Sequence, residues 1–146
     1  MLRLSYTGDL RTPILDRACL NALMERISFN SHLGLRVTRV YRDGIGMECR
    51  IEPHKLNVLG TLHGGVTATL VDAAAGVAIL GRLGGRLATT VELKVNYLRP
   101  VSEGKVHARA RIVKMGRTLC FATVEVKDDH GRLVAQGSAT YMVLES

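Results

Sequence analysis

The sequence predicts an α+β fold in which a curved antiparallel sheet wraps one long, buried helix. Residues 63–80 form an almost wholly apolar run that is too long for an ordinary strand, which favours a helix starting near His63. A helix that is apolar on nearly every side needs cover, and a curved sheet can provide it. Segments on both sides of this run alternate apolar with polar residues between turn signals, which is typical of antiparallel strands. No linker or internal repeat interrupts residues 1–146, so we expect a single domain.

The N-terminal segment carries helical signals. Thr12 and Pro13 are typical of an N-cap followed by a first-turn proline. Apolar residues then recur every four positions, so we expect one amphipathic helix over about 13–28, followed by a loop over 29–34. Residues 1–33 would form a helical extension of the domain.

Strands account for the remaining segments. The dipeptide Asp43-Gly44 is a hairpin signal, and apolar residues alternate on either side of it. The predicted strands span residues 35–41, 45–51, 87–97, 106–112, 119–126 and 133–144. Within 87–97, strict alternation places Leu87, Thr89, Val91, Leu93, Val95 and Tyr97 on one face and Thr90, Glu92, Lys94 and Asn96 on the other.

Composition excludes several classes of protein. A hydrophobic fraction of 47% argues against disorder, and an aromatic fraction of 4% without Trp supplies few stacking platforms for nucleic acid. The net charge of +7 favours an anionic ligand, although the scattered Lys and Arg residues also serve solubility. The three cysteines make no CxxC pair and signal neither a disulfide framework nor zinc. The N-terminus lacks a secretory signal and no apolar run is long enough to span a bilayer, so we expect a cytoplasmic protein without membrane partners.

One carboxylate, Asp72, lies inside the apolar helix. Burying an ionised carboxylate is costly unless a partner or a water-filled cleft offsets it. In one interpretation Asp72 lies on a narrow solvent-facing strip with Thr69 and Gly76. In the other it belongs to a catalytic site together with the helix start, where glycines allow close approach and the first-turn N–H groups suit a developing oxyanion. The local pattern leaves both interpretations open.

The spacing of these groups bears on the oligomeric state. Gly65 and Asp72 are seven residues apart, two turns along one face of a helix. That separation is roughly 10 Å, so one helix cannot easily place both groups on the same carbonyl carbon. Two antiparallel copies related by a two-fold axis can, which predicts a homodimer with shared sites. The uncovered edges of the sheet favour further association, so we expect a homotetramer.

The motif residues resemble those of hot-dog fold acyl-CoA thioesterases, in the branch of the phenylacetate-pathway thioesterases and acyl-CoA thioesterase thirteen. The resemblance runs from about Leu35 to the C-terminus, and its most specific part is a His-Gly-Gly step with Asp nine residues after the His. It rests on Asn57, Gly60, His63-Gly64-Gly65, Asp72 and the segment Val91–Pro100. It implies hydrolysis of an acyl-CoA to a free acid and coenzyme A, without a metal or redox cofactor.

The resemblance also implies roles for single residues. The Gly65 N–H polarises the thioester carbonyl, and Asp72 from the partner subunit activates water or attacks directly. Asn57 orients that carboxylate or the water, although it also suits a loop as an Asx-turn residue. Thr90 helps to hold the water, although it is equally a good strand former. We interpret His63 as structural, fixing the helix start through a ring hydrogen bond, with direct catalysis as the alternative.

Coenzyme A binding is expected around the end of the third long strand and a later turn. Arg99 and Arg117 can pair with its phosphates, and each is also typical of a solvated strand-end charge. The residues implied to bind substrate are Gly64, Leu98, Arg99, Pro100, Met115, Gly116, Arg117 and Thr118.

Other chemistries have little support. The sequence has no GxSxG, GxxxxGK[ST] or HExxH motif, and its histidines show no metal-ligand spacing. Two alternative functions stay open: a hot-dog enoyl-CoA hydratase or dehydratase, and a non-catalytic acyl-CoA-binding module. The acyl group is also open among aryl-acetyl, benzoyl-type and aliphatic groups.

Overall fold

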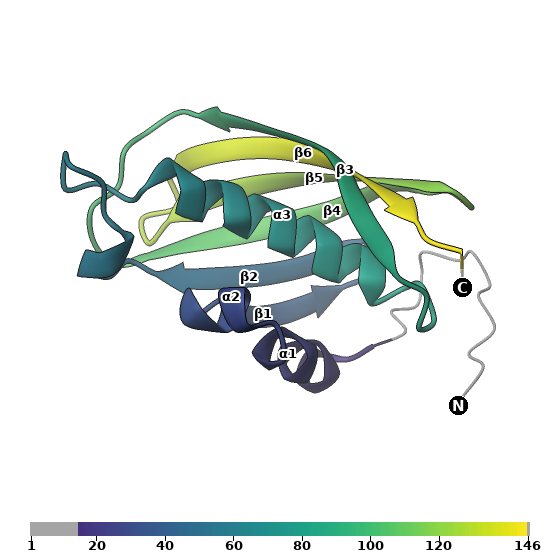
Figure 1. Ribbon diagram of the computed structural model, residues 1–146. Coiled ribbons are helices and arrows are strands. Elements are labelled where there is room, and N and C mark those ends of the chain that lie inside the picture. The colour runs from purple at the N-terminus through teal and green to yellow at the C-terminus, as the bar shows by residue number, and fades with distance from the viewer. Residues whose placement is uncertain (1–14, 146) are drawn as a thin grey trace.

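The computed structural model describes residues 15–145 and has the predicted α+β class. A six-stranded antiparallel sheet with the strand order β1-β2-β4-β5-β6-β3 curves around one long helix, α3 (Figure 1). The helices are α1 (Arg17–Glu25), α2 (Ser28–His32) and α3 (Gly64–Leu80), with a short 3₁₀ helix η1 (Pro53–Lys55). The strands are β1 (Arg36–Tyr41), β2 (Gly44–Arg50), β3 (Ala88–Tyr97), β4 (Lys105–Met115), β5 (Leu119–Asp128) and β6 (Leu133–Val143).

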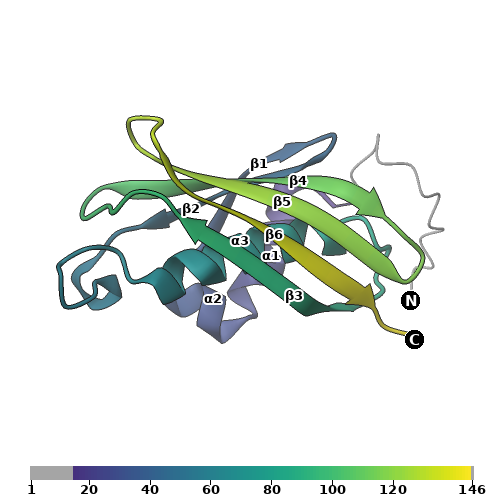
Figure 2. The same ribbon diagram turned by 90° about the horizontal axis from the view of Figure 1, so that it is seen from above.

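Helix α3 is the centre of the core. It packs against β2, β3, β4, β5 and β6, and all three α-helices lie on the same side of the sheet (Figure 2). Side chains around most of its circumference are buried, including Leu70, Val71 and Ile79 with no exposed surface. This arrangement explains why the helix has no polar face of ordinary width. Within residues 15–145, no helix is both long and apolar enough to cross a lipid bilayer.

The N-terminal helices differ from the prediction. Where one helix over 13–28 and a loop over 29–34 were expected, α1 ends at Glu25 and α2 occupies part of the expected loop. The Asp16 side chain caps α1 by accepting from the Cys19 N–H. At its other end, the N–H groups of Arg26 and Ile27 bond to carbonyl oxygens three residues earlier, which closes the last turn. The backbone of Ile27 is extended and separates α1 from α2. The four-residue periodicity carries no sign of this break, and Thr12 and Pro13 lie outside the described residues.

An irregularity in β3 overturns the predicted alternation along that strand. The β3–β6 register shifts between Thr90 and Glu92, so one extra residue is accommodated there as a bulge. Thr90 faces Asp72 of α3. After the bulge, the side chains that would have pointed to the outer face point to the inner face, and Leu93 lines the same cleft as Asp72. Thr90 and Leu93 therefore share a face, where strict alternation placed them on opposite faces. All six predicted strands are otherwise present within a few residues of their expected limits.

The close approach of α3 to the sheet depends on Gly137 in β6. A Cβ atom at this position would lie 2.4 Å from the Lys94 carbonyl oxygen and 2.9 Å from Val71 Cγ1. We expect Gly137→Ala to reduce the free energy of unfolding by about 1–3 kcal/mol, because overpacking must displace β3 or α3. Urea unfolding measures this effect, with Ser138→Ala as the control at the next position of β6. A loss no larger than that of the control would contradict the packing argument.

Candidate active site

The Asp72 carboxylate lies midway along α3 and is bound by two hydroxyl groups. Thr90 of β3 donates to Asp72 Oδ1 over 2.8 Å, and the Tyr141 hydroxyl of β6 lies 2.6 Å from the same oxygen. Thr90 and Tyr141 are directly opposite each other across the β3–β6 ladder. Within residues 15–145, Oδ2 receives no hydrogen bond. One carboxylate oxygen is thus held, and the other is available to a ligand or water.

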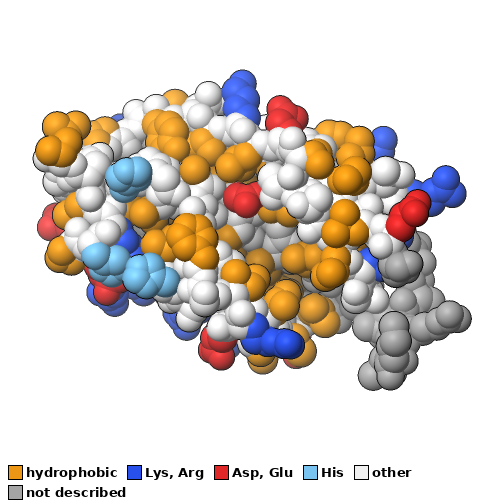
Figure 3. All heavy atoms as spheres, viewed as in Figure 1, with side chains coloured by type: hydrophobic (Ala, Val, Ile, Leu, Met, Phe, Trp, Pro, Cys, Tyr) orange, Lys and Arg blue, Asp and Glu red, His pale blue; other side chains and the backbone are white. Residues whose placement is uncertain are grey.

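Asp72 opens into a mostly apolar cleft of about 330 Å³. In the space-filling view of this side, an acidic side chain lies beside a hollow that hydrophobic side chains border (Figure 3). Thr69 and Gly76 line the same cleft, so the strip that includes them with Asp72 faces an open cleft with a mostly apolar lining. The apolar lining residues are Ile27, Phe29, Ala68, Ala73, Val77, Leu80 and Leu93.

Tyr141 is a contact of Asp72 that the sequence analysis missed. It is only 5% exposed, and burial together with its hydrogen bond to the Asp72 carboxylate raises the pKa of its hydroxyl. The hydroxyl therefore keeps its proton and acts as a donor. A tyrosine at an inward-facing strand position needs a polar partner when buried, and that signal could have linked it to the only carboxylate of α3.

The start of α3 is capped by a histidine ring. His63 has extended backbone angles, and its Nδ1 accepts a hydrogen bond from the Gly65 N–H over 2.9 Å. This is the ring hydrogen bond expected from the structural interpretation of His63. It also means that the Gly65 N–H, the predicted oxyanion donor, is already bonded. Within residues 15–145 the neighbouring Gly64 N–H has no partner, so the available first-turn donor is one residue earlier than predicted.

A second cavity, of about 590 Å³, adjoins this helix start. Tyr97 at the end of β3 donates to the Gly64 carbonyl oxygen over 2.7 Å, which ties the strand end to the first turn of α3. The cavity brings together several residues predicted to bind or activate the substrate: Asn57, Gly64, Gly65, Leu98, Arg99 and Pro100.

Asn57 shapes the loop that precedes α3. Its Oδ1 accepts from the N–H groups of Leu59 and Thr61, and its Nδ2 lies 3.0 Å from Thr61 Oγ1. This is the Asx-turn arrangement of the alternative interpretation. Asn57 makes no hydrogen bond to Asp72 of the same chain.

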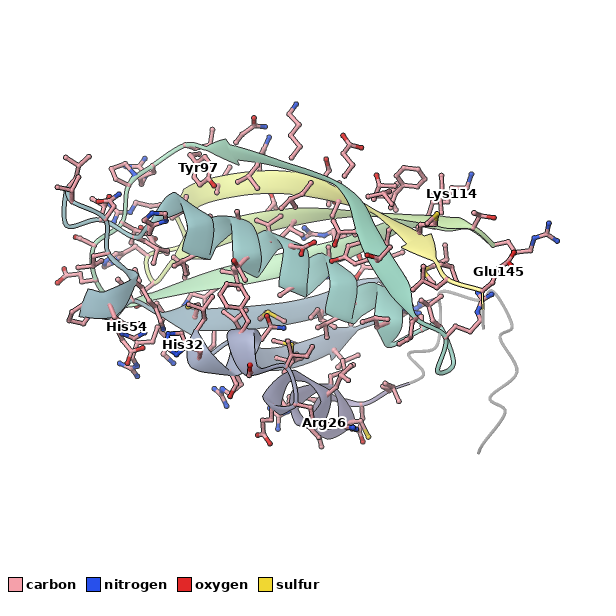
Figure 4. The ribbon with its side chains drawn as sticks, in the orientation of Figure 1. Arg26, His32, His54, Tyr97, Lys114 and Glu145 are labelled. Carbon is pink, nitrogen blue, oxygen red and sulfur yellow. The ribbon has the colours of Figure 1, made fainter. Side chains whose placement is uncertain are left out.

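The remaining predicted substrate residues lie elsewhere. Met115 ends β4, and Gly116, Arg117 and Thr118 form the β4–β5 turn. The next strand, β5, starts opposite Met142 near the C-terminal end of β6. Tyr97 and Lys114 mark opposite ends of the sheet (Figure 4). One chain therefore does not bring the β4–β5 turn together with the Leu98–Pro100 segment.

Metal-ligating side chains are not grouped in the described part of the chain. The rings of His32 and His54 contact each other edge to face, with centroids 5.7 Å apart. Among residues 15–145, no three His, Cys, Asp or Glu side chains are placed to share a metal ion.

Known proteins resemble this chain in sequence and in fold. The Thioesterase superfamily pattern matches residues 59–135. The chain is similar to the acyl-coenzyme A thioesterase 13 of Mus musculus, with 39% identity over 95 residues that cover 64% of this chain and 68% of that protein. It is similar to the crystal structure of a thioesterase from Haemophilus influenzae, with a TM-score of 0.86 and 27% identity over 93% of this chain and 95% of the other. A phenylacetic acid degradation-related protein from Ralstonia eutropha gives a TM-score of 0.75 and 28% identity over 80% and 89% of the two chains.

The six-stranded sheet around α3 is therefore a hot-dog fold, with a hydroxyl-bound carboxylate at the edge of an apolar cleft. The chain belongs to the thioesterase superfamily. Both the fold and the family agree with the resemblance in the sequence.

Proposed function

We propose that this protein is an acyl-CoA thioesterase, which hydrolyses an acyl-CoA to a carboxylic acid and coenzyme A. The observation that carries the proposal is the Asp72 carboxylate at the edge of an apolar cleft. Its Oδ1 is held by two hydroxyls, and its Oδ2 has no hydrogen-bond donor among residues 15–145. The free oxygen either removes a proton from an attacking water or attacks the thioester carbon itself. In the first route the water oxygen bonds to the carbonyl carbon, the C–S bond breaks, and the proton taken up by Asp72 passes to the leaving thiolate of coenzyme A. In the second route the C–S bond breaks as a mixed anhydride forms between Asp72 and the acyl group, and a water molecule then hydrolyses the anhydride, which releases the acid and restores the carboxylate.

The oxyanion that forms on the carbonyl needs a donor. The Gly64 N–H suits this role because it has no partner in the described part of the chain and lies at the positive end of α3. The Gly65 N–H can join it only when the His63 ring turns away. Thr90 donates to Asp72, so we assign it to orienting the carboxylate, and its oxygen can still accept a hydrogen bond from the attacking water.

Shared sites in a homodimer follow from distances along α3. Gly64 and Asp72 are eight residues apart in one helix, roughly 12 Å, which is too far for both to act on one carbonyl. An antiparallel second copy would bring the Gly64 end of one α3 to Asp72 of the other. Among the described strands, β3 is an edge strand whose one neighbour is β6, and its outer edge offers a place for that copy. Asn57 would then lie near the partner's carboxylate.

Further pairing into a homotetramer is part of the same proposal. Besides the edge of β3, the sheet carries a cluster of exposed apolar side chains near the β4–β5 turn, and such clusters favour contact with another protein surface. Its members are Val113, Leu119, Phe121 and Met142.

The two cavities would receive the two ends of the substrate. The apolar cleft beside Asp72 suits the acyl group. The cavity at the helix start suits the pantetheine arm, and the exposed Arg99 guanidinium at its rim suits a phosphate. In one chain the β4–β5 turn lies beside Tyr141 and therefore near Asp72, away from the cavity at the start of α3. Arg117 would therefore come from the subunit that supplies Asp72, and Arg99 from the subunit that supplies Gly64.

The hydratase alternative is less well supported. Proton transfer to carbon in that reaction generally uses a histidine beside the carboxylate. The side-chain partners of Asp72 among the described residues are the hydroxyls of Thr90 and Tyr141. A purely binding module has no need of a carboxylate oriented in this way.

The main test replaces the carboxylate. Asp72→Asn keeps an acceptor oxygen for Thr90 and Tyr141 but removes the charge, so we expect hydrolysis to fall about 100- to 10,000-fold with the fold retained. Release of free thiol from a set of acyl-CoA substrates measures the loss, and circular dichroism checks the fold. Turnover near the wild-type rate would remove Asp72 from the mechanism. Thioester binding without thiol release by the wild-type protein would favour the binding module.

Complementation tests whether the site is shared between subunits. Gly64→Pro removes the N–H donor, and proline is tolerated at the first position of a helix after an extended residue such as His63, with ψ 133°. Each single variant should be nearly inactive. Co-expression of Asp72→Asn and Gly64→Pro chains with different tags yields a heterodimer with one intact site, and we expect about half of the wild-type activity per dimer. A heterodimer as inactive as its parents would place the whole site within one chain.

The acyl cleft is tested through Phe29, whose ring is 59% exposed at its rim. We expect Phe29→Ala to lower kcat/KM about tenfold or more for a medium-chain aliphatic acyl-CoA and to affect acetyl-CoA little, since only the longer chain reaches the ring. Leu87→Ala, which truncates a comparably exposed apolar side chain (66%) outside the cleft, is the control. Equal losses for both substrates would show that the cleft does not hold the acyl group.

A further inference from the structure

The contacts of Tyr141 point to a role in the reaction as well as in the core. We propose that Tyr141 is a positioning residue that fixes the orientation of the Asp72 carboxylate, and that Gly76 provides the space that its hydroxyl needs. The inference rests on the proposed thioesterase function, because it concerns the same carboxylate.

The hydroxyl of Tyr141 is shared between two oxygens of one residue. It lies 2.6 Å from Asp72 Oδ1 and 2.8 Å from the Asp72 carbonyl oxygen. A separation of 2.6 Å is typical of a charge-assisted bond from a hydroxyl to a carboxylate. The phenol has one proton, so the charged Oδ1 is the stronger acceptor of the two. Together with Thr90, Tyr141 prevents the carboxylate from turning and keeps Oδ2 toward the cleft.

Tyr141 is anchored firmly enough to serve this purpose. Its ring is buried in β6, directly opposite Thr90 in β3 and Cys120 in β5. Burial and the carboxylate raise the pKa of its hydroxyl, so it remains a donor at any pH at which the enzyme would operate. A rigid strand thus supports the donor, which gives it a better-defined position than a loop residue would have.

Gly76 shows that space is reserved for this contact. A Cβ atom at position 76 would lie 2.5 Å from the Tyr141 hydroxyl oxygen and 2.9 Å from Cζ. The backbone of Gly76 is helical, so left-handed geometry is not the reason for a glycine here. A glycine inside a helix costs about 1 kcal/mol relative to alanine. Among the described contacts, the close approach of Tyr141 is the one that alanine would prevent.

Two substitutions separate positioning from packing. Tyr141→Phe keeps the ring and removes the hydroxyl, while Gly76→Ala keeps the hydroxyl and displaces it. We expect each to lower kcat about 10- to 100-fold and to leave KM within about twofold, because a displaced catalytic group slows the chemical step more than it weakens binding. The double variant should be no slower than the slower single variant, since both remove the same contact. Tyr41→Phe, which removes a phenol on β1 away from Asp72, is the matched control and should keep the wild-type kcat.

The measurements are steady-state thiol release and thermal unfolding on the same preparations. A wild-type protein that releases no thiol would refute the proposed function itself. If the wild type is active and Tyr141→Phe keeps its kcat, the positioning role is refuted. Losses in kcat that multiply in the double variant, or that match the fraction of unfolded protein, would also refute it.

Discussion

The two hydrogen bonds to Asp72 Oδ1 are the interaction on which the rest of the site depends. The Asp72 carboxylate is half-buried in an otherwise apolar helix, and each hydrogen bond to a charged group contributes about 1.5–3 kcal/mol. The donors come from adjacent strands at one level of the ladder, since Thr90 and Tyr141 are cross-strand partners. The register of β3 against β6 therefore decides whether the acid is held at all. The curvature of the sheet and the close packing of α3 serve the same contact.

Helix α3 carries its polar groups at two separate places, its N-terminal start and Asp72 in its middle. Its start presents backbone donors beside a roomy cavity, and its middle presents a carboxylate beside a narrower apolar cleft. The segment between them is occupied by buried apolar side chains such as Val66 and Leu70. The rise of the helix sets the distance between the two features, and the packing of these side chains against the sheet keeps the helix regular between them. The distance therefore cannot shorten within one chain. This constraint gives the proposal of shared sites its physical basis.

Much of the fold can be predicted from local patterns of apolar and polar residues in the sequence. The apolar run predicted α3, with its start at His63, and period-two alternation predicted six strands. The break between α1 and α2 depends on the tight turn at Arg26 and the extended backbone of Ile27, and the apolar periodicity continues across both residues. The bulge in β3 has no glycine or proline to announce it. Alternation of apolar and polar residues predicts a strand and its two faces, but it does not show where a bulge inserts one extra residue.

The site divides in the same way. Asp72, Thr90 and the helix start were singled out from sequence, and the structure brings Thr90 and Asp72 into contact. Tyr141 escaped notice because its partner is 69 residues away in the chain, and alternation alone marks it as a core residue. The Gly65 N–H is bonded to the His63 ring, whereas the Gly64 N–H has no partner among the described residues. Which amide is free depends on one rotamer, and a sequence does not encode a single rotamer.

The bulge in β3 has a consequence for how selectivity and turnover can change. Because the strand reverses its faces after Thr90, one short stretch of backbone supplies both a hydroxyl to Asp72 and the Leu93 side chain to the wall of the apolar cleft. A substitution that shifts the β3 backbone here would therefore displace both Leu93 in the cleft wall and the hydroxyl bound to Asp72. Ile27 and Phe29 line the same cleft from outside β3, so substitutions there would not act through this stretch of backbone.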